Sequence, residues 1–290
     1  MVFPAIQLTI QSGFGAERLK THIAGFDELV QGGLLERSVT TLAGAAGTGK
    51  TTFAMQYIYH GAKDDGEKGL FISYGESKDQ LEVTAKTLGL DNLAELSKEG
   101  LVTIVGILPE KKSIEAHVLE VEQLLSKTKA KRLVFDDMTG LQSICTDDEF
   151  YFLMKKLTQV GKSYGATILI TLTTSELAGS SITGLGLSTI MDSIILMRYV
   201  EVDGNMNRSM ILLKMRGTKH DSSIKKFRIE NGGIVIEGSF VGYSGILSGN
   251  ARRTIAEFED SERKIAIQER EDRTKRRQAF DDKMKAEAGQ

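Results

Sequence analysis

Eight residues in the first fifth of the sequence have the types and the spacing of a phosphate-binding loop. Gly44 to Thr51 read GAAGTGKT, which matches G-x-x-x-x-G-K-[ST] at every fixed position. Small residues let backbone N–H groups turn toward phosphate oxygens, and in this pattern the lysine, Lys50, reaches the β- and γ-phosphates. The hydroxyl of Thr51 ligates Mg²⁺. We therefore expect ATP and Mg²⁺ to be bound by Gly44, Ala45, Ala46, Gly47, Thr48, Gly49, Lys50, Thr51 and Thr52.

Two acidic residues are candidates for the rest of this site because each follows a short apolar run. Asp136 ends KRLVFD, and Glu76 follows LFISYG. Ligands of open parallel sheets bind beyond the carboxyl ends of the strands. We expect Asp136 to hold the magnesium shell and Glu76 to orient or activate the attacking water, which makes them candidate catalytic residues with Lys50. A surface position in a turn is an equally good interpretation of Glu76, and Asp137 is expected to cap a helix or contact solvent.

The elements that must position these residues alternate between short apolar runs and helix-length amphipathic stretches. This alternation predicts an α/β domain with a largely parallel sheet. The predicted strands are residues 38–43, 69–73, 101–106, 132–135, 167–172 and 193–197, and the predicted helices are 51–62, 80–88, 115–127 and 148–164. Three further strands follow at 210–214, 226–230 and 234–237. Asn231-Gly232 between the last two predicts a C-terminal β-hairpin.

The composition changes after about Gly249. Residues 251–290 contain 11 Lys+Arg and 10 Asp+Glu with few large apolar side chains, and no sustained heptad pattern indicates a coiled coil. We expect residues 1–249 to form one ATPase domain and residues 250–290 to form a charged helical or partly disordered tail.

The overall composition excludes several classes of protein. The 290 residues carry a net charge of −2, so no global field attracts nucleic acid or an anionic membrane. A single cysteine excludes an intramolecular disulfide and fits a reducing compartment. No run of apolar residues is long enough to span a bilayer, and the amino-terminal segment lacks the features of a signal peptide. We expect a cytoplasmic protein that binds neither a membrane nor nucleic acid.

Two longer stretches of the sequence resemble the KaiC family within the RecA-like ATPases. The first is GFDELVQGGLLERSVTTLAGAAGTGKTTFAMQYIYHGA. The second is STIMDSIILMRYVEVDGNMNRSMILLKMRGTKHDSSIKKFRIENGGIVI, which is similar to the second ATPase domain of the family's two-domain circadian clock members. The resemblance covers about Leu19 to Gly249, and this chain has one such domain. It implies a RecA-like P-loop fold.

The resemblance also implies a homohexameric ring with ATP between neighbouring subunits. By this analogy the KMRG segment approaches the γ-phosphate held by the next subunit, where a cation stabilises transition-state charge as an arginine finger does. Arg208 matches another nucleotide contact of the family. The residues implied at the neighbour's site are Lys214, Met215, Arg216, Thr218 and His220. Taken without the family, this segment reads as a basic edge strand with solvated charges.

The chain also matches and departs from the family at positions that bear on chemistry. Ser188 and Thr189 match positions of autophosphorylation, and Thr183 matches a third threonine nearby, although Ser-Thr pairs before a strand are common as caps. The family has two adjacent glutamates after the second strand, and here Gly75 replaces the first. Loss of a positioned general base typically costs 10²- to 10⁴-fold in rate. The family's adenine-stacking tryptophan is replaced by Leu88.

These observations support three hypotheses. The first is a slow ATPase, with autokinase activity as an extension, in a homohexameric ring. The second is an ATP-dependent scaffold or signalling protein that does not hydrolyse ATP and docks a protein partner through the charged tail. The third is a recombinase-like, DNA-dependent ATPase, which is suggested by the fold alone.

Overall fold

The computed structural model describes residues 15–109, 113–174, 187–202, 204–221 and 223–240, together with Asp260 and Lys264. Asp260 and Lys264 are helical and form an ion pair of 2.7 Å. Thr183 lies outside the described residues, as does the predicted tail at residues 250–290 apart from Asp260 and Lys264, so the domain boundary near residue 249 stays a prediction. No helix in the described ranges is long and apolar enough to cross a bilayer.

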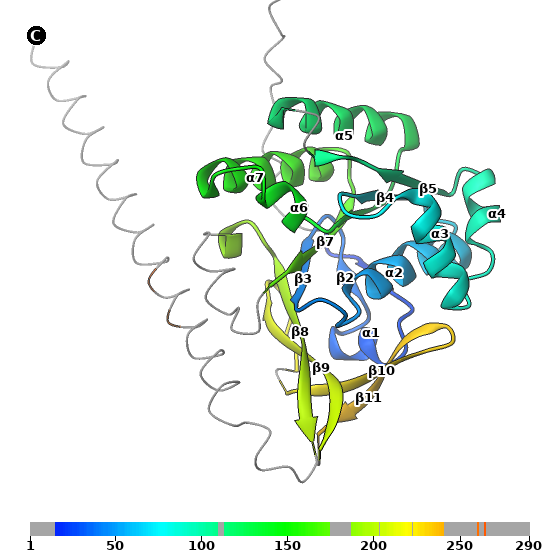
Figure 1. Ribbon diagram of the computed structural model, residues 1–290, viewed down its shortest axis with the longest axis vertical. Helices are drawn as coiled ribbons and strands as arrows, with labels where there is room; N and C mark the ends of the chain where they lie inside the picture. Colours follow the sequence, from blue (N-terminus) through cyan, green and yellow to red (C-terminus); the bar gives the residue numbers. More distant parts are fainter. Residues whose placement is uncertain are drawn as a thin grey trace, which may run out of the picture.

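The described residues form a central mixed sheet (Figure 1), whose strand order is β11-β10-β9-β8-β3-β7-β6-β4-β5. The strands from β8 to β5 in this order are parallel, and β9, β10 and β11 pair antiparallel. The parallel strands are β3 (Val39–Gly44), β4 (Gly69–Ser73), β5 (Val102–Gly106), β6 (Arg132–Asp136), β7 (Thr167–Thr173) and β8 (Ser193–Val202). The others are β9 (Asn205–Met215), β10 (Lys225–Glu230) and β11 (Gly233–Ser239), while β1 (Arg18–Leu19) and β2 (Leu34–Leu35) pair separately. The predicted fold class, with its C-terminal hairpin, is confirmed.

Helices cover both faces of this sheet (Figure 1). They are α1 (Phe26–Leu29), α2 (Lys50–Asp65), α3 (Lys78–Thr87), α4 (Leu93–Lys98), α5 (Ile114–Thr128), α6 (Thr139–Gln142) and α7 (Asp147–Ser163). Ser77 and Gln80 form a capping box that starts α3, and Thr146 and Glu149 form another that starts α7. Each box satisfies backbone N–H groups that the first turn leaves unpaired.

The core is divided by the sheet into two layers. Leu42 of β3 packs with α2, α3 and α4, whereas Val39 and Ala43 of the same strand pack with α5 and α7. Successive side chains of a strand point to opposite faces, so a strand buried on both faces must be apolar at nearly every position. This is why β3, β4 and β6 are buried along their whole length and could be read from the sequence as apolar runs.

The hairpin formed by β8 and β9 is much longer than the sequence predicts. The prediction ended the first strand at residue 197 and started the second at residue 210, but pairing continues to Val202 and Asn205. Most of the added residues are polar, and most are half-buried or exposed, so they lack the apolar pattern that marks a strand. Cross-strand hydrogen bonds hold them in place instead.

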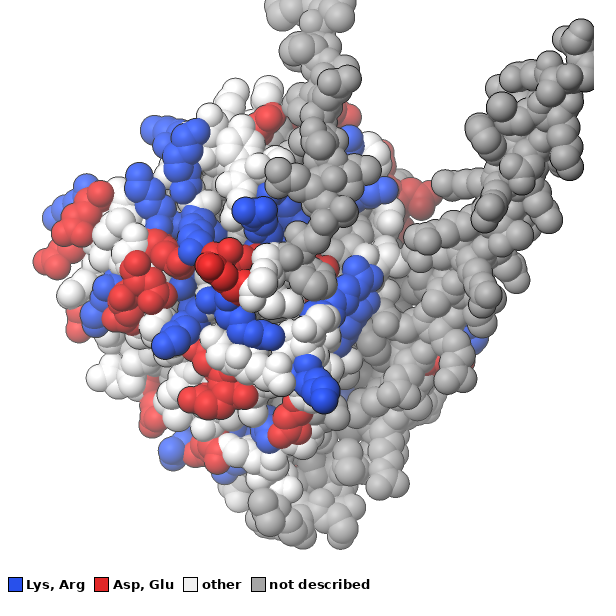
Figure 2. Space-filling view, turned by 180° about the vertical axis from the view of Figure 1, so that it is seen from behind, with Lys and Arg blue, Asp and Glu red and all other residues white. Residues whose placement is uncertain are grey.

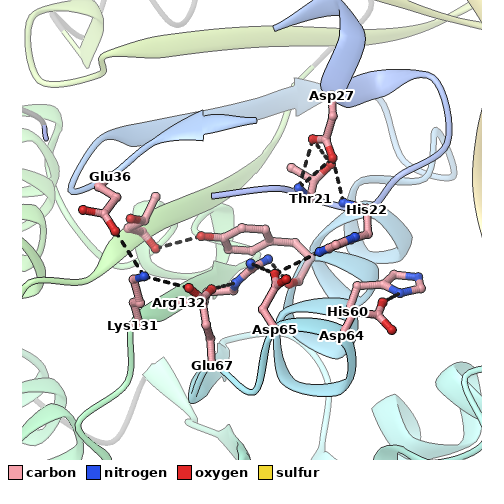
Figure 3. A network of polar contacts seen from close by, with 12 residues as sticks. Thr21, His22, Asp27, Glu36, His60, Asp64, Asp65, Glu67, Lys131 and Arg132 are labelled. Atoms are coloured by element: carbon pink, nitrogen blue, oxygen red, sulfur yellow. Dashed lines mark hydrogen bonds and ion pairs between the residues drawn. The ribbon is translucent and has the colours of Figure 1, made fainter. Parts of the chain in front are cut away.

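A buried arginine joins the end of α2 to the start of β6 (Figure 3). The Arg132 guanidinium donates to Asp65 and Glu67, both at 2.7 Å, and to the carbonyl of Tyr57 at 3.0 Å. It also lies 4.8 Å from the centre of the Tyr57 ring. Because α2 begins with the loop lysine and β6 ends with Asp136, the network fixes the far ends of the two elements that carry the candidate site.

Candidate nucleotide-binding site

The loop from Gly44 to Thr51 connects the carboxyl end of β3 to the first turn of α2. Gly47 and Gly49 have φ angles of 77° and 107°, which L side chains rarely adopt. A Cβ on Gly44 would lie 2.2 Å from the carbonyl oxygen of Met197, and a Cβ on Gly49 would lie 2.8 Å from Ile229. The neighbouring strands therefore leave room only for backbone at these positions, which keeps the loop tight.

Lys50 is folded back into the loop and is only 6% exposed. Its Nζ donates to the carbonyl oxygens of Gly44 at 3.0 Å and Ala45 at 3.1 Å. Burial lowers the pKa of Lys50, and the carboxylates of Asp137 and Asp136 counteract that shift. The ammonium thus lies inside the loop with carboxylates near it, where it can meet an anion.

Asp136 is buried and faces the loop. The Thr51 hydroxyl lies 3.2 Å from both carboxylate oxygens, and the Thr171 hydroxyl donates to one of them at 2.5 Å. Burial raises the pKa of Asp136 to about 6, against the Thr171 hydrogen bond, and the charges of Asp137 and Glu76 raise it further. A hydroxyl and a carboxylate that face each other are the hard oxygen donors that Mg²⁺ takes when phosphates and water complete its shell.

Asp137 has a different set of partners from Asp136. It accepts the N–H and hydroxyl of Thr139 at 3.0 and 2.6 Å, and the N–H of Thr173 at 3.2 Å. The Thr173 hydroxyl also donates to it. Asp137 therefore ties the turn after β6 to the end of β7, in agreement with a capping role and with no need for a ligand.

Gly75 and Glu76 follow β4 at the same edge of the sheet. The Ser73 hydroxyl accepts the N–H of Glu76 at 2.9 Å, which bends the chain where the strand ends. Both residues line a pocket of about 550 Å³ between the ends of β4 and β5 and the start of α3. A Cβ on Gly75 would meet nothing within 4 Å. The space for a carboxylate is present at position 75, but the side chain is missing.

Arg208 lies at the loop of its own chain. Its Nε lies 3.5 Å from the Gly47 carbonyl oxygen, and the hydroxyl of Tyr199 donates to the same oxygen at 2.6 Å. Tyr199 was missed by sequence analysis because no motif marks it. Tyr199 could have been found from its cross-strand pairing with Arg208, but that pairing is known only once the register of the β8–β9 hairpin is known.

The KMRG segment, residues 214–217, lies at the amino ends of the parallel strands, which we call the amino edge of the sheet. The loop lies at their carboxyl ends, the carboxyl edge. Gly44, which starts the loop, pairs with Met197 of β8, and Met197 pairs with Met210 of β9. Met215 of β9 instead pairs with Ser193, which pairs with Thr40 near the start of β3. Five residues of β9 separate the two levels, or roughly 16 Å at the rise of a strand. The structure thus separates Arg208 from Lys214 and Arg216.

The side chains of the KMRG segment have partners at this amino edge. Lys214 donates to the Ser188 carbonyl at 2.8 Å, and Arg216 lies 3.7 Å from Asp192 while its side chain remains 43% exposed. Thr218 accepts Arg18 at 3.0 Å. Met215 is buried at the same level, and His220, further along the chain, is half-buried. Lys214, Met215 and Arg216 therefore lie away from the loop of their own chain.

Ser188 and Thr189 lie in a 3₁₀ turn, η2 (Leu187–Thr189), just before β8. The Ser188 side chain is 1% exposed and its hydroxyl has no hydrogen-bond partner among the described residues, whereas the Thr189 hydroxyl lies 3.3 Å from that of Tyr151. Both share the amino edge with Lys214. Leu88, the position of the family's tryptophan, packs on the α2 side of the core, and its carbonyl accepts the Gly232 N–H at 2.7 Å.

The phosphate-binding loop follows the parallel strand β3, and Asp136 ends β6, which is separated from β3 in the sheet by β7. This arrangement defines a P-loop protein of the RecA-like class. The chain belongs to the KaiC ATPase family, because the family model "ATPase: KaiC" matches residues 19–239. Membership implies that the site binds a nucleotide.

Individual relatives support the same assignment. The chain is 36% identical over 255 residues to the circadian clock oscillator protein KaiC of Parathermosynechococcus lividus, covering 87% of this chain and 46% of that protein. For the KaiC of Picosynechococcus sp. the values are 32%, 90% and 50%. The chain therefore spans about half the length of these relatives. A solved KaiC-like protein from Pyrococcus horikoshii OT3 superposes with a TM-score of 0.68 at 29% identity, covering 76% of this chain and 98% of that one.

Proposed function

We propose that this chain binds ATP with Mg²⁺ at the loop of β3 and α2 and hydrolyses it slowly. The observation that carries the proposal is the Thr51 hydroxyl 3.2 Å from both oxygens of Asp136, beside the buried Lys50. Thr51 and Asp136 would hold Mg²⁺, which neutralises phosphate charge when bound. Lys50 and the loop N–H groups would bind the β- and γ-phosphates, and Arg208 would lie beside them.

Slow turnover follows from the position of the carboxylates. The carboxylate of Asp136 accepts hydrogen bonds from the hydroxyls of Thr51 and Thr171, so it is a poor candidate to accept a proton from water. Glu76 is half-buried beside it and is the remaining base, while Gly75 leaves the family's first glutamate position without a side chain. A displaced or missing base costs about 10²- to 10⁴-fold while binding persists.

The amino edge supports a shared site in a homohexameric ring. Lys214 and Arg216 lie too far from their own loop to reach its phosphates, yet Arg216 remains partly exposed. A ring places such an edge against the loop of the next subunit, because its interfaces join two different surfaces of the chain. In that arrangement Ser188 and Thr189 would lie near the neighbour's γ-phosphate. Thr189, which is half-buried where Ser188 is buried, would then be the more accessible residue for autophosphorylation.

Two measurements test the proposal together. ATP affinity is measured by equilibrium titration with and without Mg²⁺, and phosphate release is measured at steady state. We expect micromolar binding that weakens in EDTA, with turnover well below 1 s⁻¹, the low end of typical enzymes. No ATP binding by the wild-type chain at millimolar nucleotide would refute the function.

A non-hydrolysing scaffold is the second candidate, and Gly75 is the observation that favours it. ATP would then control ring assembly and the docking of a protein partner on the tail at residues 250–290, in the cytoplasm. Binding without phosphate release would decide for it. The DNA-dependent alternative has no support of this kind, because basic and acidic side chains are interspersed on the face shown in Figure 2.

A further inference from the structure

The carbonyl of Gly47 is held from outside the loop by two side chains of the β8–β9 hairpin. The Tyr199 hydroxyl donates to it at 2.6 Å, and the Arg208 Nε lies 3.5 Å away. Tyr199 and Arg208 are cross-strand partners, and the guanidinium lies 5.5 Å from the centre of the tyrosine ring. The pair therefore acts as one unit on a single atom of the loop.

This contact constrains the Gly47–Thr48 peptide from the side of its carbonyl, while the Thr48 N–H of the same peptide donates to the Ala45 carbonyl at 3.4 Å within the loop. Gly47 is exposed and has a φ of 77°, so its backbone has more freedom than that of other residues. A peptide unit is planar, so fixing the Gly47 carbonyl also fixes the direction of the Thr48 N–H. Thr48 is one of the loop residues whose N–H groups are expected to meet phosphate.

The hairpin is a firm support for such a contact. Met197, two residues before Tyr199, pairs with Gly44 in the sheet, and its carbonyl fills the space of a Gly44 side chain. The hairpin thus follows the loop from Gly44 to Gly47. A Cβ on Gly47 would lie 3.0 Å from the Tyr199 hydroxyl oxygen, so a glycine at position 47 leaves the space that the tyrosine hydroxyl needs.

We infer that Tyr199 is a positioning residue for the phosphate-binding loop, which acts with Arg208 by fixing the Gly47–Thr48 peptide. The inference rests on the proposed binding of ATP. It adds a residue that touches the loop from the outside and does not itself contact phosphate.

The first test is Tyr199→Phe, which removes one hydroxyl and keeps the packing of a half-buried ring. A hydrogen bond to a carbonyl is worth enough to weaken ATP binding about 3- to 10-fold when it is lost. We expect this weakening with the thermal midpoint of the nucleotide-free protein almost unchanged. Tyr164→Phe is the matched control, since Tyr164 follows α7 at the amino edge and should leave ATP affinity at the wild-type value.

The second test separates positioning from a general structural role. Gly47→Ala places a methyl group against the Tyr199 hydroxyl and strains the backbone in any background. Tyr199→Phe removes the hydroxyl oxygen that the added methyl group would contact. Gly47→Ala should therefore weaken ATP binding less in the Tyr199→Phe background than in the wild type. Simple additivity of the two losses would overturn the direct contact.

The outcomes also separate this inference from the proposed function. A wild-type chain that binds no ATP refutes the function and the inference with it. A wild-type chain that binds ATP, with Tyr199→Phe binding it equally well, refutes the positioning role alone.

Discussion

The two edges of one sheet carry polar residues of opposite character. At the carboxyl edge Lys50 is 6% exposed and Asp136 is 2% exposed, and both are held by groups of their own chain. At the amino edge Arg216 is 43% exposed and its guanidinium is 3.7 Å from Asp192. Under the proposed function the first edge would hold phosphate and Mg²⁺, whereas the second presents a partly exposed cation to a neighbouring subunit.

The β8–β9 hairpin connects these two edges. Arg208 and Lys214 lie on the same strand, six residues apart, and reach opposite ends of the sheet. Under the proposed function, one strand would therefore contact the nucleotide of its own chain through Arg208 and that of the neighbouring subunit through Lys214. The family resemblance assigned Lys214 to the neighbour's site and left the site of Arg208 open, whereas the structure places Arg208 beside the loop of its own chain.

The largest expected effect comes from the carboxyl edge. Lys50→Ala removes the ammonium that lies within the loop, and with it about two charge-assisted hydrogen bonds to phosphate. At roughly 1.5–3 kcal/mol each, their loss should weaken ATP binding by about 100-fold or more. Titration with a fluorescent ATP analogue measures this. An unchanged dissociation constant would mean that nucleotide binds elsewhere.

The loop and Asp136 were open to prediction for physical reasons. Phosphate binding demands small residues, one lysine and one hydroxyl at fixed spacing, and the buried middle of β6 at residues 133–135 is apolar up to its final acid. The sequence suggested Asp137 as a helix cap, but its contact with Thr173 was not predictable, since Thr139 at the start of α6 and Thr173 at the end of β7 lie 34 residues apart. The contact of Tyr199 with Gly47 was also hidden, because it depends on how far two polar strands continue to pair.

The second prediction uses the burial of Asp136. Its pKa rises from 3.8 to about 6, so the folded protein binds this proton more tightly than the unfolded chain does. The contribution of this group to the free energy of unfolding therefore falls as pH rises from about 4 to 6 and stays low above that. In EDTA, Asp136→Asn should stabilise the protein by roughly 3 kcal/mol at pH 8 and by little at pH 4.

Urea unfolding at the two pH values checks this prediction. Asp137→Asn is the matched control and should destabilise the protein at pH 8, because a neutral amide cannot replace a carboxylate that accepts from Thr139 and Thr173. Destabilisation by Asp136→Asn at pH 8 would show that its charge is already well compensated without a metal.

The third prediction concerns the missing glutamate. Gly75→Glu places a carboxylate in open space beside Glu76, where it could accept a proton from water, so ATP turnover should rise about 10-fold. Gly75→Gln has the same shape without the charge and should leave turnover near the wild-type rate. Equal turnover in the two variants, with normal ATP binding, would favour the non-hydrolysing scaffold.

In the proposed ring, each site joins the carboxyl edge of one subunit to the amino edge of its neighbour. A mixture of two inactive variants distinguishes such a shared site from one confined to a single subunit. In a ring formed from equal amounts of Lys50→Ala and Arg216→Ala subunits, about a quarter of the interfaces pair an intact loop with an intact Arg216, since subunits are placed at random in a head-to-tail ring. We expect about a quarter of the wild-type ATPase rate, while each variant alone is close to inactive. A mixture that forms rings of both subunits by light scattering and mass analysis, yet shows only the sum of the two parent rates, would contradict a shared site.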